Sequence, residues 1–352
     1  MNPKFWRNKR VLITGHTGFK GTWLSLWLGS MGAKVAGYAF PDPSVPSMFA
    51  LTNAEHDLQE NTYADIRQAQ ALKRAVASFR PEIVFHLAAK TIERRSFAQP
   101  VETISTNVVG TATLLDALRE CPSTRSIVVV TSDKCYAEKE DGSPQTEGDR
   151  LGGVSPYSAS KACVEMVSNS FRQAFGMRIA TARAGNVIGG GDWAEDRLIP
   201  NIMRASANGG KVFLRMPNAV RPWQHALDAL CGYLMLAEAL HTDEVFAESW
   251  NFGPDPAQAR TVTWVAEKIA TPFNVPIESD SSYVGLPETK QLRINAEKAR
   301  RELGWDTRLT IETAVEWTSQ WYQNHICGAS ARTMTLSQIE SYMDKLKMRE
   351  AA

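Results

Sequence analysis

The chain has 352 residues, of which 43% are apolar and 22% charged, and its 39 basic and 38 acidic residues leave a net charge of +1. These proportions are ordinary for a globular protein and exclude a collagen-like, coiled-coil or disordered chain. The near-zero net charge argues against a protein that binds nucleic acid or an anionic membrane through charge alone. At about 150 residues per domain, the length predicts roughly two domains or one large one.

The five cysteines are dispersed along the chain, at positions 121, 135, 163, 231 and 327. Their number is odd, they form no close pair and no histidine cluster accompanies them, so the sequence predicts neither a disulfide framework nor a metal site. A reducing cytoplasm is the expected location. The first residues lack the apolar stretch of a signal peptide, and no run approaches the roughly 18 apolar residues of a membrane span.

Short apolar runs that predict buried strands alternate with segments whose apolar residues recur at helical spacing. The expected strands cover residues 11–14, 34–39, 83–87, 127–131 and 179–183, and the expected helices cover 22–31, 66–79 and 107–118. Such alternation indicates parallel βαβ units with helices on both faces of the sheet. We therefore predict an α/β fold with a Rossmann-type doubly wound parallel sheet.

The alternation loosens after about residue 188, where three glycines and an aspartate form a loop. Beyond it, the patterns predict helices over 198–208, 226–240, 296–303 and 311–324, and a strand over 212–215. We expect residues 1–187 to form one domain, built around this sheet. Residues 188–352 would form a smaller mixed α/β domain, with some chain crossing between the two.

A glycine-rich loop joins the first expected strand to the first helix, with glycines at positions 15, 18 and 21. Glycine permits a tight turn, lets a pyrophosphate approach the backbone, and lets the helix pack against the strand. The helix N-terminus then offers free N–H groups to a phosphate. An ordinary turn also contains glycines, but this position in the first βα unit favours a dinucleotide site. The expected cofactor contacts here are Gly15, Thr17, Gly18, Phe19, Lys20 and Gly21.

The identity of the dinucleotide is less sharply indicated. The acidic residue that usually closes the second strand is missing from residues 37–40, and no arginine or lysine follows to bind a 2′-phosphate, which favours NAD over NADP. Asp65 and Ile66, between the expected strands 34–39 and 83–87, are placed to meet the adenine. Asp65 could equally be a helix N-cap, and both roles could hold.

Two further groups of polar residues suit proton transfer, one at the end of a strand and one on a helix. Ser132, Asp133 and Lys134 come at the end of the 127–131 strand, where residues of an open α/β sheet face the ligand crevice. Tyr157 and Lys161 lie four positions apart, on one face of a helix. A lysine ammonium beside a phenol lowers the pKa of the phenol, whose phenolate can take a proton from a sugar hydroxyl. Such a pair is common by chance, but here it follows a glycine loop and a strand-end serine.

On these residues, the chain resembles the extended short-chain dehydrogenase/reductase family, and within it the nucleotide-sugar dehydratases. Similar stretches extend over nearly the whole chain, at residues 15–28, 131–136, 156–161, 182–200, 220–225, 250–254 and 303–322. The resemblance implies NAD as cofactor, with Leu87, Ala88 and Ala89 also in contact with it. It implies dehydration of CDP-D-glucose to CDP-4-dehydro-6-deoxy-D-glucose, within deoxysugar and O-antigen biosynthesis.

The resemblance also implies roles for the catalytic candidates. Tyr157, helped by Lys161 and Ser132, oxidises the sugar at C4, and Asp133 protonates the leaving 6-hydroxyl. Lys134 stands where related dehydratases have a glutamate and acts at C5. It would be the base if it is neutral, which needs burial and nearby positive charge. Alternatively it stays charged and stabilises the enolate while another group takes the proton.

The resemblance places the nucleotide-sugar between Asn186 and Arg221, with Arg197 as a further candidate because a guanidinium binds pyrophosphate well. Arg197 could instead form a surface salt bridge. Trp223 could stack on a base or belong to the core, and a structural role is expected for His225. Two segments depart from the usual family pattern and leave the identity of the sugar open. Residues 90–94 read KTIER where the family usually has QPLVR, and residues 137–143 are short and polar where it is usually aromatic.

Other readings of the sequence stay open. A 4-epimerase, or a dehydratase of a different nucleotide sugar, would share the Tyr157–Lys161 pair, although an epimerase would not need Asp133 and Lys134. A non-catalytic NAD-sensing protein is a distant alternative, since such proteins can lose the tyrosine or the lysine and both are present here. By resemblance, we expect a homodimer or homotetramer that pairs through helices 107–118 and 161–175.

Overall fold

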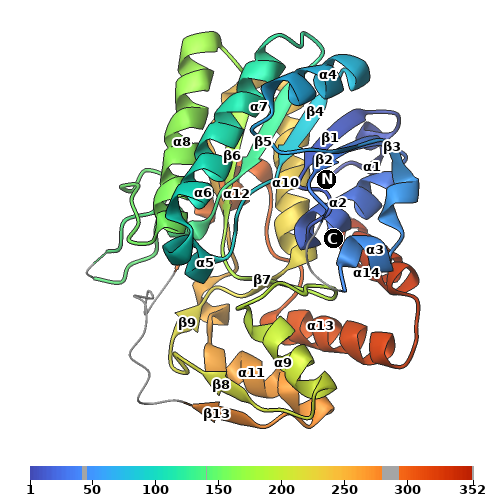
Figure 1. Ribbon diagram of the computed structural model, residues 1–352, viewed down its shortest axis with the longest axis vertical. Helices are drawn as coiled ribbons and strands as arrows, with labels where there is room; N and C mark the ends of the chain where they lie inside the picture. Colours follow the sequence, from blue (N-terminus) through green and yellow to red (C-terminus); the bar gives the residue numbers. More distant parts are fainter. Residues whose placement is uncertain (42–45, 140, 280–292, 351–352) are drawn as a thin grey trace.

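A computed structural model describes residues 1–41, 46–139, 141–279 and 293–350 of the chain. At its centre lies a sheet of seven strands, all of them parallel, in the order β11-β6-β5-β4-β1-β2-β3 (Figure 1). The strands are β1 (Arg10–Thr14), β2 (Lys34–Ala39), β3 (Leu58–Tyr63), β4 (Ile83–His86), β5 (Ser126–Val130), β6 (Ile179–Ala184) and β11 (Ser249–Phe252). The chain winds outward from β1 to β3 and then returns to β4 beside β1, so the predicted doubly wound parallel sheet is confirmed.

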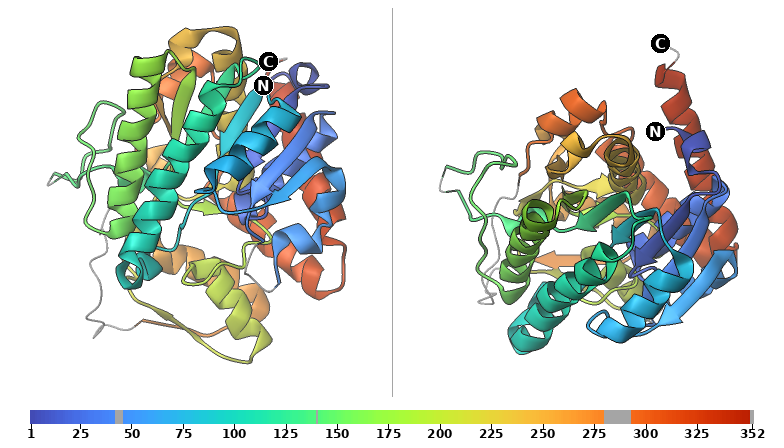
Figure 2. Two further views of the ribbon diagram at one scale, coloured as in Figure 1. Left: turned by 45° about the horizontal axis from the view of Figure 1, so that its top comes forward. Right: turned by 90° about the horizontal axis from the view of Figure 1, so that it is seen from above.

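Helices cover both faces of this sheet because alternate strand residues point to opposite sides. Leu12, Val84 and Val129 face the helices α4 (Ala69–Phe79), α7 (Gly110–Arg119) and α8 (Pro156–Phe175). Val11 and Phe85 face the opposite core with the helices α2 (Phe19–Ser30) and α10 (Ala226–Thr242). The two layers enclose the sheet (Figure 2), which explains why its inner strands β1, β4 and β5 are largely apolar and buried.

The remaining elements gather mainly beyond the carboxyl ends of the strands, in the lower part of Figure 1. They include β7 (Val187–Ile188), α9 (Leu198–Ala207), β8 (Val212–Leu214), β9 (Val220–Arg221), β10 (Gln224–His225), β12 (Arg260–Thr261), α11 (Val262–Ala270), β13 (Ile277–Ser279) and α13 (Ile311–Ile326). The chain returns to the large sheet after residue 187, because α10 packs on it and β11 pairs with β6. Helix α12 (Glu297–Leu303) packs against β11.

Short helices complete the described chain. Those in α-conformation are α1 (Pro3–Trp6), α3 (Met48–Leu51), α5 (Glu93–Ala98) and α6 (Pro100–Ile104), and a π-helical turn over Ser105–Val109 joins α6 to α7. The 3₁₀ turns cover Ala54–Asp57, Asp133–Cys135, Glu244–Phe246, Pro256–Gln258 and Thr271–Phe273. The predicted helix over 107–118 is therefore part of a longer helical run.

Helix α14 (Ala331–Glu350) was not predicted from the sequence. It lies against α2 and α3, near the beginning of the chain (Figure 2). Tyr342 packs edge-on against Trp27 at 5.5 Å between ring centroids. The buried residues of α14 form a single stripe, which consists of Ala331, Thr335, Ile339, Tyr342 and Leu346. An apolar stripe this narrow is a weak helical signal, because its stability depends on the partner surface that it covers.

Two further observations concern membranes and thiols. Of the helices within the described ranges, none is both long and apolar enough to cross a bilayer. The five cysteines are all free, and three of them are buried.

Candidate active site

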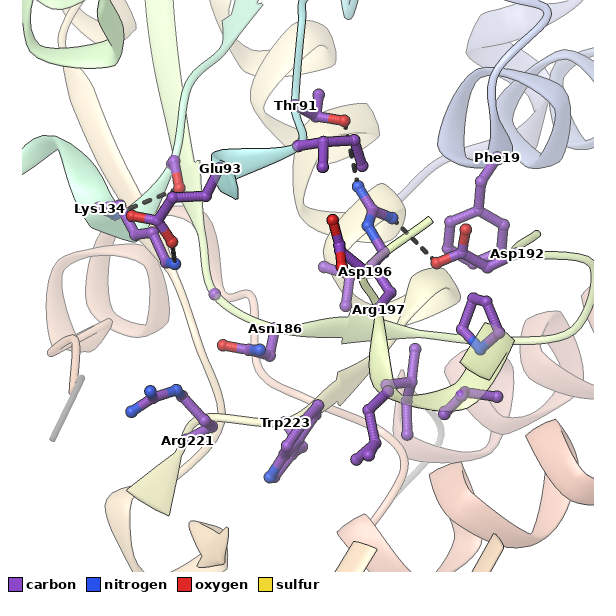
Figure 3. Close-up of a pocket in the computed structure, with 18 of the residues that line it drawn as sticks. Phe19, Thr91, Glu93, Lys134, Asn186, Asp192, Asp196, Arg197, Arg221 and Trp223 are labelled. Atoms are coloured by element: carbon purple, nitrogen blue, oxygen red, sulfur yellow. Dashed lines mark hydrogen bonds and ion pairs between the residues drawn. The ribbon is translucent and has the colours of Figure 1, made fainter. Parts of the chain in front are cut away.

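A cavity of about 350 Å³ lies between the carboxyl ends of the large sheet and the elements below it. Residues from distant parts of the chain line it, in agreement with the general rule that ligands of open α/β sheets bind at this edge. The predicted site residues among them are Phe19, Lys20, Leu87, Ser132, Asp133, Lys134, Tyr157, Lys161, Asn186, Arg197 and Arg221. The structure therefore brings members of the three predicted groups to one cavity (Figure 3). The other predicted cofactor residues do not line it, namely Gly15, Thr17, Gly18, Gly21, Asp65, Ile66, Ala88 and Ala89.

The glycine loop turns from β1 into α2, and its three glycines are required for different reasons. Gly15 has a φ of +75°, and a β-carbon there would lie 2.6 Å from the backbone nitrogen of Ala88. A β-carbon on Gly21 would lie 2.2 Å from the carbonyl oxygen of Gly15, so this glycine permits helix and loop to touch. Gly18, the N-cap of α2, would meet only the Gly15 oxygen at 3.6 Å. No contact with another described residue demands glycine at position 18, which leaves an open cradle at the helix N-terminus that fits a pyrophosphate.

Two polar side chains of the loop have different surroundings. The Thr17 hydroxyl donates a hydrogen bond to the carbonyl oxygen of Phe40 at 2.6 Å and so ties the loop to the end of β2. The Lys20 side chain reaches the cavity, where its Nζ lies 3.5 Å from the hydroxyl of Tyr233. Burial, helped by the nearby charges of Lys161 and Arg197, lowers the pKa of Lys20 to about 7.

Asp65 lies beyond β3 and is not a helix N-cap, so that alternative is wrong. The N-cap of α4 is Gln68, and the Asp65 carboxylate accepts hydrogen bonds from the backbone and guanidinium of Arg67. The Arg67 guanidinium lowers the pKa of Asp65. Ile66 packs against α7, where a β-carbon on Gly110 would lie 2.4 Å from its Cγ2.

The residues after β4 form the other wall of the loop. Leu87, Ala88 and Ala89 follow the strand directly and are partly buried. The backbone N–H of Ala88 donates to the Thr14 hydroxyl at 3.3 Å. This segment therefore lies beside the glycine loop at the point where the sheet order reverses, as a dinucleotide-binding fold requires.

Ser132 and Asp133 follow β5, where Ser132 caps the short 3₁₀ turn that begins at Asp133. The Asp133 carboxyl is buried, and its Oδ1 accepts a hydrogen bond from the Ser132 hydroxyl at 3.1 Å. Its Oδ2 has no hydrogen-bond partner among the described residues. Burial raises the pKa of Asp133 to about 6, against the lowering effect of Lys134, so the protonated acid is within reach near neutral pH.

Tyr157 and Lys161 lie on the first turns of α8 and both line the cavity, as their spacing predicted. The predicted lowering of the phenol pKa by Lys161 is wrong for this geometry. Burial raises the pKa of Tyr157 to about 12, although a hydrogen bond with Ser132 and the charge of Arg197 act in the opposite direction. The Lys161 ammonium donates instead to the carbonyl oxygen of Val130 at 3.0 Å, and burial lowers its pKa to about 8.

Lys134 forms an ion pair with Glu93, in a very short contact between Nζ and Oε2 (Figure 3). Glu93 comes from residues 90–94, the segment that departs from the family pattern, and it opens helix α5. The Ser155 hydroxyl, which caps α8, donates to the other oxygen of this carboxylate at 2.9 Å. An ammonium in such a pair carries its proton, so the structure favours the charged alternative for Lys134.

The predicted substrate residues line the lower side of the cavity. Asn186 belongs to the link from β6 to β7, and Arg221 lies in β9 with 7% of its surface exposed. Arg197 forms a 2.9 Å ion pair with Asp192 and also reaches the Thr91 hydroxyl at 3.3 Å. Arg197 therefore forms the salt bridge that the alternative predicted, but this pair lies in the cavity and not on an outer surface (Figure 3).

The two aromatic candidates have clear structural roles. Trp223 is buried and donates its indole N–H to the carbonyl oxygen of Arg260 at 3.1 Å, although it also borders the cavity. The structural role predicted for His225 is confirmed, because its Nδ1 caps α10 by accepting from the N–H of Leu227 at 3.2 Å. The residues that the structure describes include no group of three or more His, Cys, Asp or Glu placed to hold a metal ion.

Sequence reasoning did not assign three charged residues that the structure places at or behind this site. Glu93 pairs with Lys134 and Asp192 pairs with Arg197, both in the cavity. Glu165, behind Lys161 on α8, forms a buried 2.8 Å ion pair with Arg183. Only Glu93 had a local signal, which is an acidic residue at a position where the family usually has valine.

Comparisons with known proteins agree with this arrangement. The chain matches the family described as GDP-mannose 4,6 dehydratase over residues 12–318. It is 42% identical to CDP-glucose 4,6-dehydratase of Salmonella typhimurium, over 97% of this chain and 98% of that protein.

Two solved structures share the fold. The dTDP-glucose 4,6-dehydratase of Bacillus anthracis, in complex with NAD, has a TM-score of 0.76 at 23% identity and covers 90% of this chain and 97% of its own. The UDP-glucose 4-epimerase of Thermotoga maritima, with UDP-glucose, also has a TM-score of 0.76, at 20% identity, and covers 90% and 99%. The chain is therefore a member of the GDP-mannose 4,6 dehydratase family, as its resemblance to the nucleotide-sugar dehydratases predicted.

Proposed function

We propose that the protein is an NAD-dependent hydro-lyase that converts CDP-D-glucose to CDP-4-dehydro-6-deoxy-D-glucose and water. The observation that carries this proposal is the buried Asp133, with one free carboxyl oxygen, in the same cavity as Tyr157, Lys161 and Lys134. A sugar redox site needs the tyrosine and lysine, whereas loss of a hydroxyl group also needs an acid. The 42% identity to CDP-glucose 4,6-dehydratase supports the choice of nucleotide and sugar.

The residues around the glycine loop fit NAD. The Gly18 cradle and the N-terminus of α2 would hold the pyrophosphate, with Thr17, Phe19 and Lys20 beside it. Asp65 and Ile66 would border the adenine, and Leu87, Ala88 and Ala89 the dinucleotide near β4. When bound, NAD supplies a hydride acceptor at C4 and a hydride donor at C6 of the sugar.

Tyr157 would accept the proton of the 4-hydroxyl, with Ser132 hydrogen-bonded to its phenol. Because the Tyr157 pKa is about 12 in this geometry, the phenol needs a cation closer than Lys161 now lies. We infer that the Lys161 side chain turns toward Tyr157 or toward the nicotinamide ribose when the site is filled. Asp133, whose pKa of about 6 brings its protonated form within reach near neutral pH, would give its proton to the leaving 6-hydroxyl.

Asn186, Arg197 and Arg221 would hold the nucleotide-sugar, since two guanidiniums suit the four charged or polar oxygens of a pyrophosphate. Arg221 also lies close enough to Asp133 to lower its pKa. Binding of the anionic substrate beside Arg221 would weaken this lowering and favour the protonated acid. Substrate binding and the acid role of Asp133 would thus support one another.

The principal alternative is a 4-epimerase, which the structural likeness to UDP-glucose 4-epimerase keeps in view. An epimerase returns the hydride to C4 and loses no water, so it has no need for the buried acid at Asp133. A non-catalytic NAD-sensing protein would not need Tyr157 and Lys161 in one cavity.

The deciding experiment is incubation of the NAD-loaded protein with CDP-glucose, and separately with the UDP, dTDP and GDP sugars. We expect a 4-keto-6-deoxy product from CDP-glucose, detected by mass spectrometry as a loss of water. A 4-epimer of unchanged mass would contradict the dehydratase and support the epimerase. Unchanged sugar with every substrate would contradict both enzymes.

We infer a two-part organisation, with residues 1–187 binding NAD and most of residues 188–352 binding the substrate. The position of α9, β8 and α11 below the sheet supports this division (Figure 1). Helix α10 and strand β11 belong to residues 188–352 but join the large sheet, so the chain crosses between the two parts there.

We propose that the protein is a homodimer that pairs through the helical run α6–α7 and helix α8. Large apolar side chains are exposed there, namely Val101, Ile104 and Val109 on the first and Met166 and Phe175 on the second. Isolated exposed apolar residues are ordinary, but several on adjacent helices indicate an interface. Val101→Glu with Val109→Glu should lower the mass measured by sedimentation to that of a monomer, whereas an unchanged mass would contradict this interface.

The cytoplasmic location and a role in O-antigen synthesis stay predictions.

A further inference from the structure

Lys134 cannot accept a proton while it is an ammonium, and its pairing with Glu93 keeps it in that form. The elimination nevertheless needs a group that removes the proton from C5 of the 4-keto sugar. Asp133 is taken by the opposite task, since it must supply a proton to the 6-hydroxyl. The cavity must therefore offer another acceptor beside Lys134.

Glu93 has the chemistry and the position of that acceptor. It lines the cavity and touches Lys134 directly, and its charge is close enough to raise the pKa values of both Asp133 and Tyr157. Glu93 therefore interacts electrostatically with the proposed acid and with the redox tyrosine. Its side chain is 24% exposed and that of Lys134 is 29% exposed, so both groups are accessible from the cavity.

The contacts of the carboxylate leave room for a proton. Oε1 accepts from the Ser155 hydroxyl at 2.9 Å and from the Ser158 hydroxyl at 3.5 Å, and Oε2 accepts from the Lys134 ammonium. A carboxylate offers about four lone-pair positions, so these three contacts orient the group and still leave a position for a proton. Ser155 is itself held as the N-cap of α8, two residues before Tyr157, which ties the orientation of Glu93 to the helix that carries the redox tyrosine.

We propose that Glu93 is the proton acceptor at C5 and that Lys134 remains charged to stabilise the enolate. The C5–H bond breaks, its proton moves to Glu93, and its electron pair stays on the sugar, conjugated with the C4 carbonyl. The C6–O bond then breaks as Asp133 protonates the departing hydroxyl, and water leaves. After a hydride reaches C6, Glu93 returns its proton to C5, and the proton taken from the 4-hydroxyl restores Asp133. This inference rests on the proposed function.

The test separates oxidation at C4 from exchange at C5. In Glu93→Gln, a single turnover with CDP-glucose should form the reduced nicotinamide at a rate within about threefold of the wild type. Solvent deuterium should enter C5 at least about 100-fold more slowly, the usual size of a general-base effect. Retained oxidation at C4 also shows that the variant is folded.

The Lys9–Glu82 pair is a matched control at the opposite edge of the sheet. Its side chains are 24% and 22% exposed, close to the 29% and 24% of Lys134 and Glu93. Glu82→Gln should leave both rates unchanged. Exchange at C5 within about threefold of the wild type in Glu93→Gln would overturn the proposal.

A second variant distinguishes proton transfer from positioning of Lys134. In Glu93→Gly, added formate, acetate and propionate should restore exchange at C5, with rates that rise with the basicity of the carboxylate. Absence of rescue, or rescue that ignores basicity, would overturn the acceptor role. If the wild-type protein oxidises no nucleotide sugar, the proposed function itself is wrong. Normal oxidation with normal exchange in Glu93→Gln would instead contradict only the role of Glu93.

Discussion

The Oδ2 oxygen of Asp133 lies 3.0 Å from the point that a β-carbon on Gly185 would occupy. The missing side chain of Gly185 leaves the space into which this unpartnered oxygen of a buried carboxyl points. A carboxyl in such a place favours its protonated form, because burial penalises the charge and no described residue donates to the second oxygen. Gly185 thus places the proposed acid beside the loop that also carries Asn186.

The stability of the protein should depend on this protonation. The pKa of Asp133 is raised from 3.8 to about 6 in the folded state, so between these values the folded chain holds more protons than the unfolded chain. The contribution of Asp133 to the free energy of unfolding therefore falls as pH rises through this window. Asp133→Asn lacks the ionisation and should be more stable at neutral pH by about 3 kcal/mol, measured by urea unfolding.

Comparison at two pH values isolates this effect. Asp228 is also buried, with a pKa of about 7, so the wild type has a second carboxyl that acts in the same direction. The difference in the free energy of unfolding between Asp133→Asn and the wild type should grow from about pH 4 to about pH 7. The variant should also lose the dehydration activity. A constant difference would show that the pKa of Asp133 is the same in the folded and the unfolded chain.

Lys20 should make cofactor affinity dependent on pH. Its pKa is about 7, and its protonated form attracts the phosphates that the N-terminus of α2 would hold. If binding requires the ammonium, the Kd for NAD should rise about tenfold from about pH 6 to about pH 8. Lys20→Met should bind NAD more weakly at low pH and lose the dependence, as titration calorimetry would record. A Kd that is independent of pH in the wild type would place the pyrophosphate away from Lys20.

Gly15 and Gly18 should respond differently to replacement by alanine. Gly18 has ordinary backbone angles and room for a β-carbon, so Gly18→Ala should melt near the wild-type temperature. It should nevertheless lose about tenfold or more in affinity for NAD, because the methyl group fills the cradle. Gly15→Ala combines a φ of +75° with a contact of 2.6 Å and should lose about 1–3 kcal/mol of stability or more without any cofactor. Unchanged NAD affinity in Gly18→Ala would exclude this loop as the phosphate site.

Breaking the buried ion pair between Glu165 and Arg183 should strongly destabilise the protein. Their side chains are 2% and 3% exposed, so Arg183→Met leaves a carboxylate in the core without its cation. We expect a loss of about 3–5 kcal/mol in urea unfolding. Adding Glu165→Gln to this variant should recover part of the loss, because the remaining group is then neutral. Equal stabilities of the single and double variants would mean that the Glu165 carboxylate is already neutral.

Local patterns were sufficient to predict much of the fold and part of the site. The glycine loop is specified within one βα unit, and Tyr157 and Lys161 share a cavity because their spacing matches one turn of α8. Helix α14 escaped prediction because the surface that it covers, around Trp27, lies more than 300 positions earlier in the chain. No window of sequence contains both partners.

The sequence by itself determined the parallel sheet, the glycine loop and the family, because each depends on residues that are neighbours along the chain. The tertiary structure decided the state of the catalytic groups. The Lys134 ammonium meets Glu93 from 41 positions away, and burial changes the pKa of Asp133. Charge states depend on what surrounds a group in space, and only the folded chain sets the distances and the burial that decide them.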